Sequence, residues 1–448
     1  MMNEMSELYS FFTGIESLSF FVDETGKKLR EIGQEEMREC LNNPINFIRK
    51  LLEVKENCER MCATSFAGDR KFVARLNEEF EVLVNRCRQV AEYFAVYLDF
   101  LLKSSAGGNL PLEVNSCTFL FRFIHEKDVF ERIYKKSLAK RLLSGTSTCY
   151  ELEKAVVTKL RTECGFQFTQ KMEHMLRDVE TWQKMNDEYS EHCKLHSQIR
   201  NIKFNIRVAT AGVWPLYTDD YVLSPQLSPI FQEFSNFYTS KHKGRKLTLC
   251  RSAGYASLLA NFEPAIGESR QKTISTSTLQ MLVLLQFNLK NNWTFKELLE
   301  STKMSVKDLG RNLVALTCKG QNVLISSSKK STDFDANDVF SVNEQFQSSS
   351  DVVKVAAVAA YHQSDKAADT REKTEIDRKF EVEACIVRLM KRNRKMNHDE
   401  LIANVLEEMK DRCGVIGTST VKQRIEALIE REFIARDSSE FKVYCYVE

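Results

Sequence analysis

Residues 418–447 read TSTVKQRIEALIEREFIARDSSEFKVYCYV, and this stretch decides the fold of the C-terminal part of the chain. Val421, Ile425 and Leu428 recur at helical spacing, which predicts an amphipathic helix. After that helix, apolar residues on both sides of a polar turn predict the two strands of a hairpin. A helix that leads directly into a hairpin is typical of the third helix and the wing of a winged helix.

The residues before this stretch complete the same unit. Apolar residues at helical spacing mark two further helices: Val382, Ile386 and Leu389 in the first, and Leu401 and Val405 in the second. The third helix is expected to begin at a cap formed by Thr418 or Ser419. Three helices and a hairpin therefore predict a winged helix over residues 377–448.

The same order of elements is expected once more over residues 275–345. Ser277, Thr294 and Ser305 each stand where a helix N-cap is expected, and Glu297 gives Thr294 the spacing of a capping box. Apolar residues at 323–326 and 339–342, on both sides of a polar turn, predict the hairpin. The last third of the chain is therefore predicted to hold two winged helices in tandem.

Residues 346–376, between these two units, are polar and lack apolar periodicity. Such a composition predicts a linker. Because each winged helix closes its own core, little apolar surface is left to fix their relative position. We therefore expect residues 377–448 to be loosely docked.

Residues 1–105 and 117–200 show apolar residues at helical spacing, with a break at the sequence AGGN of residues 106–109. Near residue 200 the period changes. Phe204, Ile206 and Val208 alternate with polar residues and predict a strand, with partner strands at 246–250 and 256–262. The fold class is therefore mainly α, with a small α/β sheet and two winged-helix domains. A sheet with few strands has open edges, which accept strands from other chains.

The composition agrees with a largely helical protein. The 448 residues include only 16 Gly and 6 Pro, so few turns are available for strands. The formal net charge of +2 gives no global attraction to nucleic acid or to an anionic membrane. The 13 cysteines form no C-x-x-C pair, and the apolar residues 18–22 are too few to span a bilayer. We therefore expect a protein of the cytoplasm, the nucleus or both, without membrane attachment.

The sequence offers no set of catalytic or metal-binding residues. His192, Cys193 and His196 form the densest Cys/His cluster, but zinc requires a fourth ligand that no nearby residue supplies. A Gly-rich phosphate loop and an H-E-x-x-H motif are both missing. We therefore predict a protein that is not an enzyme, with no catalytic residue, metal or cofactor of its own.

Several segments resemble the cullin family. Residues 386–391 (IVRLMK), followed by His398, resemble the cullin neddylation motif, and residues 421–433 resemble the cullin C-terminus. Residues 134–143 (YKKSLAKRLL) are similar to the helical bundle of that family. Residues 212–215 (GVWP) and 244–248 (GRKLT) are similar to its α/β region.

The resemblance implies the C-terminal half of a cullin. The implied order is a last cullin-type helical repeat (1–110), a four-helix bundle (111–200), an α/β RING-binding region (201–274), winged helix A (275–345), a linker (346–376) and winged helix B (377–448), the neddylation domain. The earlier repeats, which bind the substrate adaptor in this family, are absent, so adaptor binding is not expected.

The resemblance also implies a function. The chain is expected to be the scaffold subunit of a cullin-RING ubiquitin ligase, recruiting a RING-box protein and, through it, a ubiquitin-conjugating enzyme. The RING zinc then arrives on the partner. Phe204, Ile206, Val208 and Trp214 are expected to bind the RING-box protein, although Trp214 can instead pack in the core. The alternative is a truncated regulatory or decoy cullin that binds the RING-box protein without an adaptor.

By the same resemblance, Lys391 is the acceptor of an isopeptide bond to the neddylation modifier. Five of the eight residues 388–395 are basic, and Lys391 falls opposite the apolar stripe of its helix. Neighbouring cations favour the neutral amine that attacks a thioester. The residues expected to dock the conjugating enzyme are Arg388, Arg392, Arg394, Lys395 and His398.

A winged helix can also bind nucleic acid through its third helix. In winged helix B the basic residues of that helix are interrupted by Glu426, Glu430 and Glu432, which phosphates repel. Nucleic-acid binding is therefore the less favoured function.

Overall fold

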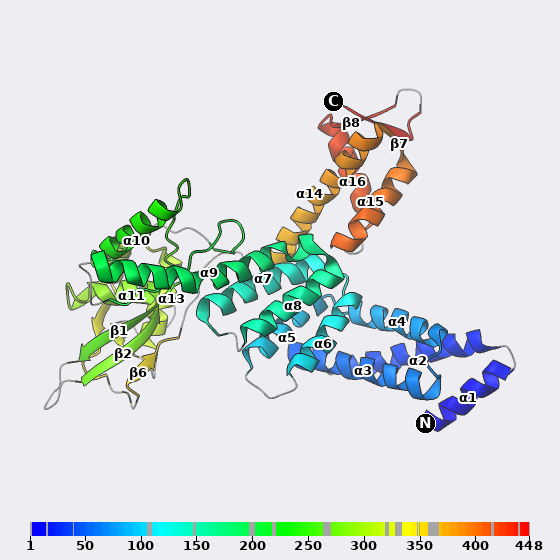
Figure 1. Cartoon of the computed structure of the whole chain (residues 1–448), viewed down its shortest axis with the longest axis horizontal. Helices are drawn as coiled ribbons and strands as arrows, with labels where there is room; N and C mark the ends of the chain where they lie inside the picture. The colour runs from blue at the N-terminus through cyan, green and yellow to red at the C-terminus, as the bar shows by residue number, and fades with distance from the viewer. Residues whose placement is uncertain are drawn as a thin grey trace. The chain divides into compact units, whose positions relative to one another are not determined.

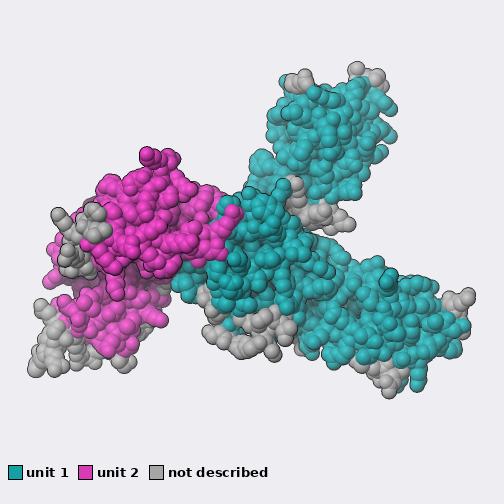
Figure 2. Space-filling model, viewed as in Figure 1, with its two compact units in different colours: residues 1–176, 366–448 teal, residues 177–365 magenta. Residues whose placement is uncertain are grey.

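The computed structural model describes residues 2–14, 17–38, 40–104, 110–146, 149–196, 202–216, 221–262, 270–318, 322–327, 334–346, 348, 350–356, 367–413, 416–437 and 440–447. The chain divides into two compact units, one of residues 1–176 with 366–448 and one of residues 177–365 (Figure 2). None of the helices among the described residues is long and apolar enough to cross a membrane.

The first unit begins with five helices, in which α2 packs on α4 and α3 packs on α5 (Figure 1). Their bounds are α1 (Met2–Gly14), α2 (Leu18–Arg38), α3 (Pro44–Ser65), α4 (Arg70–Asn85) and α5 (Val90–Lys103). Phe21, Phe66 and Phe72 form a buried aromatic cluster in which the ring centroids of Phe66 and Phe72 lie 4.0 Å apart. The predicted break at 106–109 lies outside the described residues.

A helical bundle follows, with bounds α6 (Leu110–Leu120), a short 3₁₀ turn (Phe121–Phe123), α7 (Lys127–Ser144), α8 (Tyr150–Cys164) and α9 (Phe166–His196). The fully buried Arg141 of α7 lies inside it. Its Nε and Nη2 donate to the two carboxylate oxygens of Glu153 at 2.7 and 2.9 Å, and Nη1 donates to Asp99 at 2.6 Å. A cation without water requires such partners, so these ion pairs tie α7 to α8 and α5.

The second unit contains α10 (Ser228–Lys241) and a three-stranded sheet of order β1-β2-β6. The strands are β1 (Tyr255–Phe262), β2 (Arg270–Ser277) and β6 (Val352–Lys354). β1 and β2 are antiparallel, with Leu258 opposite Ile274, and β6 runs parallel to β2. The prediction of a strand at 256–262 is therefore confirmed.

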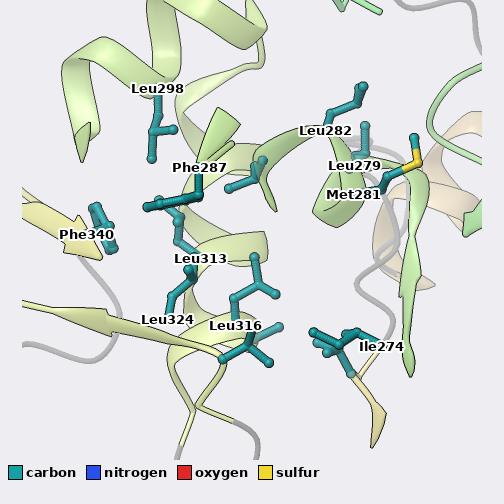
Figure 3. Packing of buried hydrophobic residues seen from close by; sticks show 14 of the residues in the cluster. Ile274, Leu279, Met281, Leu282, Phe287, Leu298, Leu313, Leu316, Leu324 and Phe340 are labelled. Atoms are coloured by element: carbon teal, nitrogen blue, oxygen red, sulfur yellow. The ribbon is translucent and has the colours of Figure 1, made fainter. Parts of the chain in front are cut away.

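Winged helix A is confirmed in the same unit. Its elements are α11 (Thr278–Gln286), β3 (Asn292–Thr294), α12 (Phe295–Thr302), α13 (Val306–Thr317), β4 (Leu324–Ser326) and β5 (Val339–Val342). Ser277, Thr294 and Ser305 cap the three helices as expected, the first two in complete capping boxes. The core includes Leu282, Leu313 and Phe340 (Figure 3).

Winged helix B is also confirmed. Its elements are α14 (Ala367–Asn393), β7 (Lys395–Asn397), α15 (His398–Cys413), α16 (Thr418–Glu430), β8 (Ile434–Arg436) and β9 (Val443–Tyr446), with the sheet order β7-β9-β8. Its fully buried core contains the predicted stripes, including Ile386, Leu401 and Ile425. The expected cap is wrong, since α16 begins after Gly417 without a side-chain hydrogen bond.

Two predicted strands are absent from the described residues. Residues 202–210 and 246–250 belong to no ladder, although the side chains of residues 204–208 alternate between half-buried and exposed. The alternation predicts an extended backbone correctly. A strand also requires a neighbouring backbone, and neither segment has one among the described residues.

The predicted linker at 346–376 is wrong for two of its parts. Residues 352–354 form β6, and Val353 and Val355 are buried in the core of winged helix A. Residues 367–376 belong to α14, and residues 357–366 lie outside the described ones. A strand of three residues needs only one or two apolar side chains. The composition of a mostly polar segment therefore does not reveal such a strand.

The first turns of α14 are attached to the helical bundle of the same unit. Arg378 forms a two-pronged ion pair with Asp128, whose Oδ1 lies 2.6 Å from Nη2. Arg371 donates to Glu92 at 2.5 Å and to Glu126 at 3.2 Å. These polar contacts supply an attachment that a search for apolar stripes does not detect.

Candidate functional site

Lys391 lies in the last turn of α14, with its side chain exposed. The helix buries Val382, Ile386 and Leu389 on the other face. Among the described residues, the structure shows no ion pair or hydrogen bond to the Lys391 ammonium. The expected exposure of this lysine is therefore observed.

A groove of about 670 Å³ runs between α14 and α16, and Lys391 is one of its lining residues. Its apolar lining residues, here called its floor, include Phe380 and Phe433, which remain 62% and 46% exposed. The other apolar lining residues are Ala384, Val387 and Leu428. A groove with two exposed aromatic rings is a surface of the kind that binds proteins.

The rim of this groove is basic. It consists of Arg388, Lys391, Arg392 and Arg431, with Glu383 as its single carboxylate. Glu383 is paired with Arg431 at 2.6 Å and with Arg424 at 3.4 Å. Because the carboxylate is neutralised, the rim carries a net positive charge and favours an acidic partner.

None of the residues predicted from the core-facing stripes indicates this groove. Phe380, Ala384, Val387 and Lys391 follow one another at spacings of four, three and four residues, so they form a second stripe along α14. This second stripe is the feature of the sequence from which the groove could have been predicted. Only the packing of α16 beside it turns the stripe into a groove.

The predicted docking residues separate into two groups. Arg388 and Arg392 line the groove with Lys391. The other three lie toward the sheet: Lys395 Nζ contacts Asp437 Oδ2 at 2.7 Å, His398 Nδ1 lies 2.8 Å from the hydroxyl of Tyr444, and Arg394 lies over the ring of Tyr446. The hydrogen bond to Asp437 raises the pKa of Lys395, opposite to the shift expected within a cluster of cations.

The second candidate site is the extended segment at residues 202–210. Phe204, Ile206 and Val208 are half-buried and pack against an aromatic cluster of α9 and α10 that contains Tyr189 and Phe234. Their side chains therefore face the helices. What this segment offers to a partner is mainly its backbone.

One edge of this backbone is satisfied by side chains of α9. The Asn186 amide accepts from Ile206 N and donates to Ile206 O, both at 2.8 Å. Trp182 Nε1 donates to Val208 O at 2.8 Å. These contacts hold the segment extended without a neighbouring strand.

The opposite edge is open. Successive residues of an extended chain direct their N–H and C=O groups to alternate sides, so Asn205, Arg207 and Ala209 direct theirs away from α9. Among the described residues, the structure shows no backbone hydrogen bond for these three. Such an edge can accept one more strand.

Trp214 packs in the interior, which is one of its two expected roles. Its indole stacks on Trp182 with centroids 5.3 Å apart, and Nε1 donates to Asp178 at 2.7 Å. Asp178 also accepts from Thr210 N and Oγ1, each at 3.0 Å. This cluster anchors the C-terminal end of the extended segment.

The Cys/His cluster on α9 has a packing role where it is described. The ring of His192 lies 4.9 Å from that of Phe237, and Cys193 joins the same aromatic cluster. The described residues contain no group of three His, Cys, Asp or Glu side chains that could hold a metal ion.

Comparison with known protein families identifies the whole arrangement. Residues 1–186 match the cullin alpha solenoid domain, residues 208–346 the cullin alpha+beta domain and residues 377–440 the cullin protein neddylation domain. The three matches occur in the order expected from the resemblance, and the last contains Lys391 and its groove. The chain therefore belongs to the cullin family.

Individual cullins are similar to this chain over most of its length. Cullin-3 of Caenorhabditis elegans is 37% identical over 97% of this chain and 59% of its own length. Cullin-3A of Arabidopsis thaliana is 34% identical over 99% of this chain and 61% of its own length. Human cullin-4A is 32% identical over 90% of this chain and 53% of its own length. The chain thus spans about three fifths of the cullin-3 relatives.

Proposed function

We propose that this chain is a non-catalytic scaffold subunit of a cullin-RING ubiquitin ligase, in the cytoplasm, the nucleus or both. The membership of the family and the matched neddylation domain support this proposal. The scaffold binds a RING-box protein, which brings a ubiquitin-conjugating enzyme. Its contribution to the reaction is proximity, because holding two reactants together raises their effective concentration.

The RING-box protein binds by adding a strand to the open edge of residues 205–209. The observation that carries the proposal is the open edge itself: the edge facing α9 is satisfied by Asn186 and Trp182, whereas the opposite edge has no hydrogen-bond partner among the described residues. Main-chain pairing supplies affinity in this mode of recognition. Phe204, Ile206 and Val208 contribute indirectly, because their packing holds the backbone in register.

The test compares Arg207→Pro with Arg207→Ala. Proline removes the N–H that faces the open edge, whereas alanine keeps it and removes only the side chain above Trp182. We expect Arg207→Pro to weaken the affinity for purified RING-box protein, measured by calorimetry, at least about tenfold. The reason is the loss of one hydrogen bond between the two strands, together with a steric clash of the proline ring. Arg207→Ala changes this affinity by no more than about threefold. If the folded Arg207→Pro variant binds the RING-box protein as tightly as the wild type does, the partner strand does not pair with residues 205–209.

Lys391 accepts the neddylation modifier. The exposed amine stands at the edge of a groove with an apolar floor and a basic rim, and an acidic conjugating enzyme docked there delivers its thioester beside Lys391. Lys391→Arg keeps the charge and removes the nucleophile, so most of the mass-shifted band on a denaturing gel is lost and only slow modification at Lys395 remains. Lys379→Arg, on an exposed part of the same helix, is the control and leaves the band unchanged.

Two alternatives have separate tests. A truncated regulatory or decoy cullin co-purifies with the RING-box protein but with no substrate adaptor, which mass spectrometry of the purified complex determines. A nucleic-acid binder requires cations available on α16. Arg424 and Arg431 are both paired with Glu383, which disfavours this function.

A further inference from the structure

We propose that Asp437 directs the modifier to Lys391 by holding the neighbouring Lys395 in an ion pair. This inference rests on the proposed modification of Lys391 and concerns the choice between two lysines four residues apart. Both belong to the same basic segment, and the charge of that segment does not distinguish them.

The backbone separates the two lysines. α14 ends at Asn393, and Arg394 adopts a left-handed conformation with φ of 64°. The carbonyl of Arg394 accepts from Tyr446 N at 2.9 Å, which fixes this turn against β9. Lys391 therefore remains on the helix at the groove, while Lys395 begins β7 opposite Cys445.

The carboxylate that meets Lys395 is held firmly. Asp437 follows β8, its N–H donates to Val443 O at 2.9 Å, and its side chain is only 13% exposed. Asp437 Oδ2 lies 2.7 Å from Lys395 Nζ and 3.6 Å from the Sγ of Cys445. A carboxylate fixed in this way stabilises the ammonium form of Lys395, and the pKa of Lys395 is raised accordingly.

The ion pair between Lys395 and Asp437 affects the transfer reaction because the attacking amine has to be neutral. The neutral amine attacks the thioester carbonyl carbon that joins the modifier to the conjugating enzyme; a C–N bond forms, the C–S bond breaks and the thiolate leaves with the electron pair. The proton lost by the amine goes to water. Lys395 has to leave Asp437 before it can lose that proton. Lys391 has no such partner among the described residues.

The first test measures amine reactivity without any enzyme. The full chain is treated with limiting N-hydroxysuccinimidyl acetate, and acetylation at each lysine is quantified by mass spectrometry. We expect Lys391 to react faster than Lys395 in the wild type. Asp437→Asn raises the rate at Lys395 about two- to fivefold, the range for an exposed ion pair, and leaves Lys391 unchanged.

Glu426→Gln is the matched control. It removes the same charge from winged helix B, where Glu426 pairs with Arg436 and, in the part of the chain that the structure describes, with no lysine. The proposal is overturned if Lys395 reacts as fast as Lys391 in the wild type, or if Glu426→Gln activates Lys395 as much as Asp437→Asn does. The wild-type comparison needs no variant, so a folding defect cannot hide the result.

The second test uses purified conjugating enzyme and modifier. In a Lys391→Arg background, adding Asp437→Asn raises modification at Lys395 about two- to fivefold. Equal rates at Lys395 with and without Asp437→Asn overturn the proposal. If the wild type is not modified at all, the proposed role of Lys391 fails, and the acetylation test still decides the role of Asp437.

Discussion

The two winged helices have the same order of three helices and a hairpin, yet they differ in what they leave exposed. Winged helix A shares its core with the neighbouring sheet, since Ile274 of β2 lies in one cluster with Leu316 of α13 (Figure 3). Val353 of β6 belongs to the same cluster. Winged helix B closes a core of its own. Its helix α14 keeps a second apolar stripe, and with α16 this forms the groove beside Lys391.

One local pattern therefore serves two purposes. In A, the surface beside the core is used to hold the sheet, on which the α/β region depends. In B, the corresponding surface stays available to a partner. The following experiments test this contrast.

The largest effect is expected from truncating either core. Leu316→Ala in A and Ile425→Ala in B each truncate a fully buried side chain. Each is expected to lower the free energy of unfolding by about 2–5 kcal/mol. Because A shares its core, Leu316→Ala should also raise hydrogen exchange in β1 and β2, whereas Ile425→Ala should leave these strands protected. Equal exchange of the two strands in both variants contradicts the contrast.

A smaller effect is expected at the attachment of α14. Arg378→Ala removes the two-pronged ion pair with Asp128, in which both side chains are mostly buried. The free energy of unfolding should fall by about 1 kcal/mol, and by less at high salt. Hydrogen exchange should rise over the first turns of α14 and stay unchanged in α16. Lys379→Ala, one residue along and exposed, serves as the control and should have no effect.

The groove in B can be tested without unfolding it. Phe433→Ala removes a half-exposed ring from the floor, so stability should change little, while the rate of Lys391 modification falls about threefold. Phe441→Ala removes a ring that is 75% exposed on the same hairpin but does not line the groove. If both variants slow the reaction equally, the effect belongs to the hairpin and the groove is not the docking surface.

The smallest effect concerns the helix caps. The Lys290 ammonium and then the backbone N–H of Thr294 lower the pKa of Glu297 in A to about 2. A lowered carboxyl pKa stabilises the folded form fully above pH 4.5, the ordinary value, and this contribution is lost as pH falls toward 2. Thermal midpoints of wild type and Glu297→Gln should therefore differ most at pH 6 and approach each other as the pH falls through 3 toward 2.

The same titration sharpens the contrast, because α16 of winged helix B begins after Gly417 without a side-chain cap. Hydrogen exchange should show the acid-dependent loss in α12 and none in α16. An equal loss in both helices would mean that general acid destabilisation, and not Glu297, causes it.

Much of the fold was predictable because it depends on residues close together in the sequence. Ser277, Thr294 and Ser305 cap helices through hydrogen bonds to residues three positions away. The stripes containing Ile386, Leu401 and Ile425 repeat at the helical period, so the buried face of each helix follows directly. The exposure of Lys391 follows from its position outside these stripes, and its proposed role comes from the resemblance of the residues around it.

The sequence by itself therefore determined the helices, the caps of winged helix A, the two hairpins and the exposure of Lys391. The tertiary structure decided the rest, because those features depend on distant partners. β6 exists because β2 lies beside it, and the groove requires α16 beside α14. Residues 202–210 join no ladder within the described residues, because side chains of α9 occupy the place of a strand. Lys395 differs from Lys391 only because a turn brings Asp437, 42 residues away, to within 2.7 Å of its amine. Periodicity records which face of an element is buried, but hydrogen bonds and ion pairs between distant segments leave no period in the sequence.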